Sequence, residues 1–290
     1  MADQTITRPL AIDSSIKRPR DPAKQALDLK RQPGFGTVAM LCLAMLYAPI
    51  VILVIFSFNT SPSVTRWQSF SLTWFIKVLG NRDIHDAAFN SLEISIIATV
   101  VSTIIATAAA LATTRTRPWP GQTAAYMVIN LPLIVPEIIT AVATLSFFAL
   151  LASVAKINLG IGNLILAHSV FCIPFAYMPI RARLEDMDLT LEQAAADLYA
   201  TPWQTFRRVT LPLLTPGVSS GAALAFIVSI DDFTITQMVA GPGQTTLPLY
   251  IWGQLHKSGV TPEINAISTI LLVVSILFVT LSFLIGRKRK

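Results

Sequence analysis

The stretch LEQAAADLYATPWQTFRRVTLPLLTPG, residues 191–217, is polar and amphipathic, and it lies between two strongly apolar segments. In the longer loop at about 181–216 that includes most of this stretch, apolar positions recur at helical spacing: Leu189, Leu191, Ala194, Ala195 and Leu198. Helices this short are marginal alone in water, so they need a surface to pack against. The loop at about 181–216 is therefore predicted to lie on its own bundle or to dock a partner protein.

The second half of this loop carries signals for the start and the end of a helix. Thr201 precedes Pro202, and Gln204 stands where a capping box returns a hydrogen bond to the N-cap residue. Leu211 precedes Pro212, and a residue before proline disfavours helical geometry. We expect two short helices with a bend near residues 199–200, the second ending at 211–212.

The composition indicates a membrane protein. The chain has 290 residues, of which 53% are hydrophobic and 13% charged, whereas soluble chains carry about 25% charged residues. Several apolar runs reach the ~20 residues that span a bilayer as a helix. The net charge of +6 does not indicate nucleic-acid binding, because the basic residues gather at segment ends and in selected loops. Cys42 and Cys172 lie in apolar runs, as small buried hydrophobes do.

The apolar runs predict an all-α polytopic membrane protein with six transmembrane helices. We expect them at about 36–58, 90–113, 125–151, 161–180, 218–239 and 262–285, within a transmembrane domain over 36–286. Asn90 or Ser91 is the expected cap of the second helix, and Thr261 and Pro262 start the sixth.

The charge distribution predicts the orientation. Residues 1–35 are polar and are expected to be a disordered tail, and residues 287–290 form a basic tail. If both termini are cytoplasmic, most of the 22 basic residues fall on the cytoplasmic side, as the positive-inside rule requires.

Three acidic residues fall inside the predicted spans. Asp231 and Asp232 lie in the fifth span, and Glu137 follows Pro136 in the third. A carboxylate at a helix centre costs about 2.5–3.5 kcal/mol on insertion scales and usually faces an interior or an aqueous cavity. The three residues are candidates for lining a pathway for a cation, or for bonding a broken backbone or sealing a partner subunit.

The other polar residues of the spans are interpreted as structural. Glu93 and Glu263 are expected in first helical turns, where a carboxylate suits the helix dipole. His168 is expected to be packed and hydrogen-bonded.

The loop resembles the EAA loop of type I ABC importer permeases. Gln193-Ala194-Ala195, then Tyr199, then Val209-Thr210-Leu211-Pro212 follow its spacing. The family glutamate is Gln193 here, with Glu192 adjacent, and the family glycine is Tyr199. A tyrosine at this place must take an unfavourable backbone angle or shift the bend to Ala200.

Three further blocks narrow the resemblance to the spermidine/putrescine branch of these permeases. They are SIDDFTIT at 229–236, GPGQTTLP at 241–248 and TPEINAIST at 261–269, with Ser57-Phe58-Asn59 after the first helix. The resemblance covers about residue 36 to the end.

The resemblance implies a subunit of an importer in a bacterial inner membrane. Its partners would be a cytosolic ABC ATPase dimer, a second permease subunit and an extracytoplasmic substrate-binding protein that contacts about residues 59–88. This chain would hold no cofactor, and ATP would bind the ATPase. The residues implied in ATPase coupling are Glu192, Gln193, Ala194, Ala195, Asp197, Leu198, Tyr199, Ala200, Leu211 and Pro212.

Two alternatives stay open from the residues alone. The chain lacks a G-x-x-x-x-G-K-S/T phosphate loop and an H-E-x-x-H zinc motif. A self-contained secondary carrier or channel needs no ATPase, and a membrane scaffold would use the loop only for recruitment.

Overall fold

The computed structural model describes residues 34–63 and 66–287, and the elements that it forms there are helices. Residues 34–51 form one compact unit and residues 52–287 another. The predicted tail at 1–35 lies outside the described residues except for its last two positions. The basic tail at 287–290 lies outside them except for Arg287.

Six helices are long and apolar enough to cross a membrane, which confirms the predicted number within the described residues. They are Gly36–Ser57, Arg82–Thr114, Glu137–Val154, Ile161–Glu185, Pro202–Ile230 and Pro262–Ser282. The first belongs to α1 (Phe35–Ser57), whose residues 36–50 are exposed in the structure.

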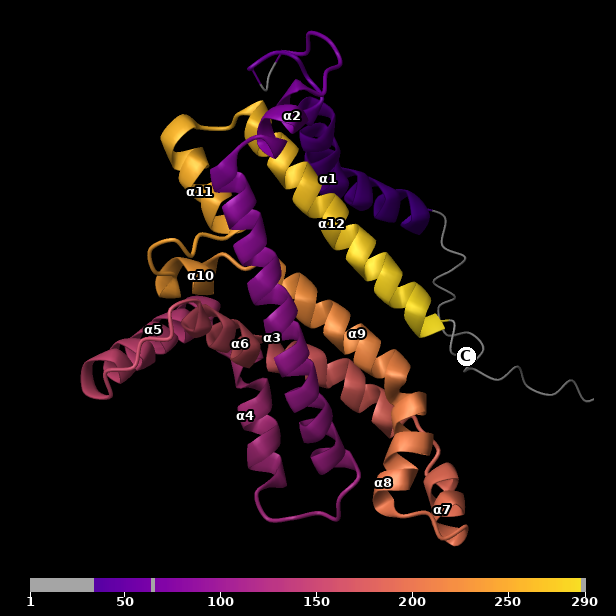
Figure 1. Ribbon diagram of the computed structural model, residues 1–290. Helices are drawn as coiled ribbons and strands as arrows, with labels where there is room; N and C mark the ends of the chain where they lie inside the picture. Colours follow the sequence, from indigo (N-terminus) through magenta and orange to yellow (C-terminus); the bar gives the residue numbers. More distant parts are fainter. Residues whose placement is uncertain (1–33, 64–65, 288–290) are drawn as a thin grey trace, which may run out of the picture. The chain divides into compact units, whose positions relative to one another are not determined.

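The remaining elements connect these spans (Figure 1). The full order after α1 is α2 (Thr73–Leu79), α3 (Arg82–Thr114), α4 (Gln122–Ile134), α5 (Glu137–Val154), α6 (Ile161–Glu185), α7 (Thr190–Asp197), α8 (Pro202–Thr205), the π-helix η3 (Phe206–Thr210), α9 (Leu211–Ile230), α10 (Thr234–Val239), α11 (Leu247–Ser258) and α12 (Pro262–Arg287).

The core of the second unit lies where α3, α6 and α9 pack together. Two glycines of α9 allow a close crossing with α6. A Cβ atom on Gly221 would lie 2.6 Å from the carbonyl oxygen of Ala176, and one on Gly217 would lie 2.6 Å from Cβ of Arg183. Small residues four apart bring membrane helices together in this way, because only they let the backbones approach.

The third predicted span, at 125–151, is wrong as a single helix. The structure divides it into α4 and α5, with Val135 in an extended conformation (φ −79°, ψ 133°) and Pro136 as the N-cap of α5. The pyrrolidine ring of a proline pushes the preceding residue out of helical geometry. The break leaves Glu137 as the first residue of α5.

The second span begins at Arg82, eight residues before its predicted start. Asn81 is the N-cap, and its Oδ1 accepts the backbone N–H of Asp83 at 3.0 Å. The expected caps, Asn90 and Ser91, therefore lie inside α3. Glu93 lies inside α3 as well, so its predicted place in a first turn is wrong.

The fifth span ends at Ile230 and does not continue to residue 239 as predicted. A turn at 231–233 separates it from the short helix α10. The sixth start is confirmed, because α12 begins at Pro262 and Thr261 Oγ1 accepts the N–H of Ile264 at 3.4 Å. Glu263 lies in the first turn of α12, as expected, and pairs there with Lys77 of α2 (Oε2–Nζ 3.0 Å).

Candidate functional site

The loop between α6 and α9 folds into two short helices, α7 and α8, that turn sharply at Tyr199. Tyr199 has φ +59°, so the tyrosine takes the left-handed backbone itself and the bend does not move to Ala200. The capping box of α8 is confirmed. Gln204 N donates to Thr201 Oγ1 at 3.3 Å, and Thr201 N donates to Gln204 Oε1 at 2.9 Å.

The predicted end of the second loop helix at Leu211-Pro212 is wrong. Helical backbone runs without a break from Pro202 through η3 into α9. Pro212 lies just after the π-helical turn η3, in which the N–H of Leu211 donates to the carbonyl oxygen of Phe206. The turn changes the hydrogen-bond register at the place where proline has no N–H to donate. The loop is thus continuous with a membrane span.

Most residues assigned to ATPase coupling face solvent. Leu198 and Tyr199 are 82% and 96% exposed. The other exposed members of the set are Gln193, Ala194, Asp197, Leu211 and Pro212, and the half-buried ones are Glu192, Ala195 and Ala200. Large apolar side chains exposed on a polar loop are typical of a surface that docks another protein.

Glu192 differs from the other residues of this set, because its carboxylate points toward the bundle. Its Oε1 accepts from Nε of Arg115 (3.3 Å), at the end of α3, and from Oγ1 of Thr210 (2.9 Å), in η3. A cavity of about 330 Å³ opens beside these groups, and Ala196, Ala200 and Phe206 also line it. The loop is therefore bonded to two elements that enter the bundle.

Asp188 precedes α7 and stabilises its start. The backbone N–H of Thr190 donates to Asp188 Oδ1 at 2.9 Å, and this hydrogen bond holds the pKa of the Asp188 carboxyl group below its usual value. The carboxylate also suits the positive end of the helix dipole.

Asp232 is buried at the break between α9 and α10. Its Oδ1 accepts the N–H of Ile235 at 3.3 Å, and its Oδ2 accepts the N–H and the hydroxyl of Thr236 at 3.0 and 3.1 Å. The carboxylate therefore satisfies the amides at the start of α10, which have no helical partner.

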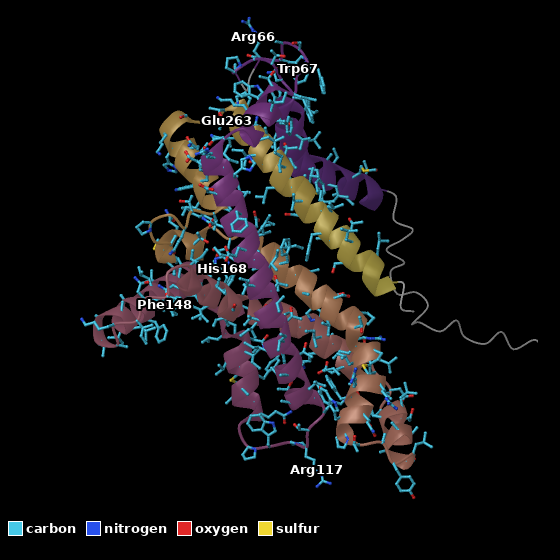
Figure 2. The ribbon with its side chains drawn as sticks, viewed as in Figure 1. Arg66, Trp67, Arg117, Phe148, His168 and Glu263 are labelled. Carbon is cyan, nitrogen blue, oxygen red and sulfur yellow. The ribbon has the colours of Figure 1, made fainter. Side chains whose placement is uncertain are left out.

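His168 of α6 completes the same network. Its Nε2 lies 3.4 Å from Asp232 Oδ2 and 3.1 Å from Thr236 Oγ1, and its Nδ1 lies 2.9 Å from Ser229 Oγ. In Figure 2, His168 lies between the end of the bundle that carries Arg66 and Glu263 and the end that carries Arg117. The network is thus deep in the bundle and holds α6, α9 and α10 together.

Asp231 is directed away from this network, although it is adjacent to Asp232. It is exposed to a cavity of about 540 Å³. Phe233 and Trp252 line that cavity with ring centroids 4.9 Å apart, and Leu255 and Leu271 form part of its apolar wall. The cavity combines one carboxylate with two aromatic rings, a combination that suits an organic cation.

Glu137 comes close to Asp232, because α5 lies against α10. The Glu137 carboxyl group lies close enough to interact with the carboxylate of Asp232 and with the hydroxyl group of Thr234. Two helix breaks, at 135–136 and at 231–233, therefore meet in the bundle, with Glu137 directly after the first and Asp232 within the second. The third candidate, Asp231, also belongs to the second break but faces the cavity of about 540 Å³.

Sequence reasoning missed the residues that hold the segment before α11. Asn90 Nδ2 donates to the carbonyl oxygens of Gly243 and Thr245, both at 3.0 Å. Ser91 Oγ accepts the N–H of Leu247 at 2.7 Å. Sequence reasoning also missed Trp252, since nothing local links it to Asp231. Within the described residues, no group of three or more His, Cys, Asp or Glu side chains is arranged to hold a metal ion.

Residues 102–288 match the family described as "Binding-protein-dependent transport system inner membrane component". The chain is 37% identical over 248 residues to the putrescine transport system permease protein PotI of Escherichia coli K12, covering 85% of this chain and 88% of PotI. It is 38% identical over 245 residues to the spermidine/putrescine transport system permease protein PotC of Haemophilus influenzae, covering 84% and 93%.

Solved structures show the same fold. A chain of a bacterial ABC transporter involved in the import of alginate superposes with a TM-score of 0.70 at 16% identity, over 92% of this chain and 99% of that one. A chain of the MetNI methionine ABC transporter gives 0.61 at 18% identity, over 70% and 94%. From the family match and from the relatives of nearly equal length, this chain belongs to the inner membrane components of binding-protein-dependent transport systems, the non-catalytic permease subunits of ABC importers.

Proposed function

We propose that this chain forms half of an inner-membrane pathway for a small cationic, polyamine-like substrate. The relatives named for putrescine and spermidine support this substrate class. The observation that carries the proposal is the placement of Glu137 and Asp232 where two helix breaks meet inside the bundle, with Asp231 at the adjacent cavity of about 540 Å³. Carboxylates placed there give an ammonium ion counter-charges where water is scarce.

Among the three carboxylates, Asp231 is the one we assign to direct contact with substrate. Its neighbour Asp232 already accepts three hydrogen bonds and lies beside His168. Asp231 lines the cavity of about 540 Å³ together with Phe233 and Trp252, and aromatic rings attract an ammonium group. The apolar wall of the cavity suits the methylene units between two amines.

The pathway would be completed by a second, different permease chain, and an ATPase dimer in the cytosol would drive it. An extracytoplasmic binding protein would deliver the substrate to the opposite face. The coupling loop and both termini are then cytoplasmic, and the end of the bundle with Arg66 and Glu263 faces outward (Figure 2).

The continuous helix supports a mechanical link between the loop and the carboxylates. One helical rod runs from Pro202 to Ile230 and ends next to Asp231. A displacement of α8 by the ATPase would tilt this rod as a rigid body and would shift the break at 231–233. ATP could bias the two states because it binds the ATPase more tightly in one of them.

The test is uptake of radiolabelled putrescine by proteoliposomes that contain both permeases, the ATPase and the binding protein. Asp231→Asn should lower uptake about tenfold or more, because it removes the counter-charge and keeps the size of the side chain. The matched control is Asp186→Asn, which changes an exposed carboxylate at the C-terminal end of α6. Wild-type uptake by D231N would contradict the assignment.

The same system separates the proposal from a self-contained carrier. Uptake should stop when the ATPase is left out or ATP is replaced by a non-hydrolysable analogue. Uptake by this chain alone would overturn the importer pathway.

A further inference from the structure

The helix α7 touches the membrane bundle through very few polar groups. Within the described residues 34–63 and 66–287, Glu192 is the only residue of α7 whose side chain makes a hydrogen bond or an ion pair with α3 or η3. Gln193, which stands at the family's glutamate position, is exposed and faces solvent. The adjacent carboxylate, that of Glu192, points inward.

The two partners of Glu192 stand at the ends of different membrane elements. Arg115 is the C-cap residue of α3, and Thr210 is the last residue of η3, directly before α9. Both bonds end on the same carboxylate oxygen, at 3.3 Å from Arg115 Nε and 2.9 Å from Thr210 Oγ1. A single atom of α7 is thus bonded to α3 and to the rod that contains α9.

The environment makes these bonds stronger than those of an exposed surface pair. The side chains of Arg115 and Glu192 are only 16% and 20% exposed, and Thr210 is 5% exposed. Glu192 supplies the counter-charge of the Arg115 guanidinium, whose Nη2 is buried and has no hydrogen-bond partner in the described structure. Removing one partner of such a pair leaves a poorly solvated charge.

We propose that Glu192 is a positioning residue that joins α7 to α3 and α9, so that both helices follow the loop when it moves. This inference rests on the proposed function, because it assumes that an ATPase displaces the loop. Without the bond to Arg115, a push on α7 would still reach α9 through α8 and η3, but it would reach α3 only indirectly, through the packing of α3 against α9. Glu192 would then not contact the ATPase itself. It would determine how much of the loop's motion reaches the membrane helices and is used for transport.

The first test uses this chain alone in lipid nanodiscs and measures hydrogen–deuterium exchange of the α7 amides. Glu192→Gln should raise exchange in α7 about tenfold, because a charge-assisted bond is lost. The matched control is Glu185→Gln, which breaks an ion pair within α6 between the exposed Glu185 and the half-buried Arg181 (2.8 Å). Equal exchange of α7 in wild type and E192Q would overturn the proposal.

The second test uses the complete importer with both permeases, ATPase and binding protein. E192Q should keep normal copurification of the ATPase and normal basal ATP hydrolysis, while putrescine moved per ATP hydrolysed falls about tenfold. The charge-swapped variant Arg115→Glu/Glu192→Arg should regain part of the coupling that either single variant loses, which would not happen if Glu192 acted independently of Arg115.

Two results would overturn the proposal. One is loss of the ATPase from E192Q, which would make Glu192 a direct docking contact. The other is a loss of coupling in the charge-swapped variant that equals the sum of the losses in the two single variants. If the wild-type importer moves no putrescine, the proposed substrate fails instead, and exchange in the nanodiscs still tests the link between α7 and the bundle.

Discussion

Asp232 and His168 come from different elements and lie 3.4 Å apart (Oδ2–Nε2), and each side chain is only 1% exposed. The carboxylate also caps α10, and the imidazole reaches Ser229 of α9 through its other nitrogen. A buried polar network that is satisfied on every side fixes one arrangement of its helices. This network holds the break between α9 and α10 in place beside the exposed Asp231.

Replacing Asp232 by Ala should destabilise the chain by about 1–3 kcal/mol, because the α10 amides and His168 lose their acceptor. Replacing it by Asn should cost less, since asparagine also caps helices. Unfolding in mixed micelles, followed by circular dichroism, measures both. Equal stability of D232A and wild type would remove the structural role of Asp232.

Tyr199→Gly should stabilise the chain by about 1 kcal/mol, because Tyr199 has φ +59° and its side chain is 96% exposed. The control is Leu198→Gly, at a residue with φ −85°, which should not stabilise. Thermal unfolding in detergent compares the two variants. A lower midpoint for Y199G would show that the left-handed residue carries no strain.

Gly221→Ala should destabilise the crossing of α6 and α9 by about 1–3 kcal/mol, because the new Cβ would meet the carbonyl oxygen of Ala176 at 2.6 Å. Gly253→Ala is the matched control: this helical glycine of α11 has no atom within 4 Å of a new Cβ. That variant should be neutral or slightly stabilising. Chemical unfolding distinguishes them, and equal losses would refute the close approach.

Ala194→Glu should abolish copurification of the ATPase while membrane insertion stays normal, because Ala194 is exposed on α7 and a bulky charge would block an apolar contact. Ala155→Glu, at an exposed site after α5, is the control. Affinity purification of the complex gives the ratio of ATPase to permease. An unchanged ratio for A194E would reject α7 as the docking helix.

Asp188→Ala should loosen α7 at neutral pH, because the hydrogen bond from Thr190 N–H is lost. The pKa of Asp188 is lowered in the folded chain, so its stabilisation is present above the ordinary aspartate pKa and disappears as the pH falls through the lowered value. Proteolysis of the loop at several pH values should therefore show the difference between wild type and D188A at pH 7 and none in strong acid. A difference that persisted in acid would assign the effect to another group.

The sequence by itself determined the number of spans, the capped start of α8 and the bend at Tyr199. These features depend on neighbours in the chain: a run of ~20 apolar residues, a Thr-Pro-x-Gln pattern, and Tyr199 at the position where the family has a glycine. It also placed Pro136 beside the break of the third span, although it did not predict that the helix would stop there.

Only the tertiary structure decided the roles of the acidic residues. Adjacent aspartates in one sequence block took different environments, because the turn after Ile230 directs Asp232 toward His168 and Asp231 toward Trp252. Glu192 pairs with Arg115, 77 positions away in the chain, because tertiary packing brings α7 to the end of α3. Local patterns fix where a helix begins and ends, whereas the partner of a buried charge depends on which helices pack side by side, and no short-range rule encodes that packing.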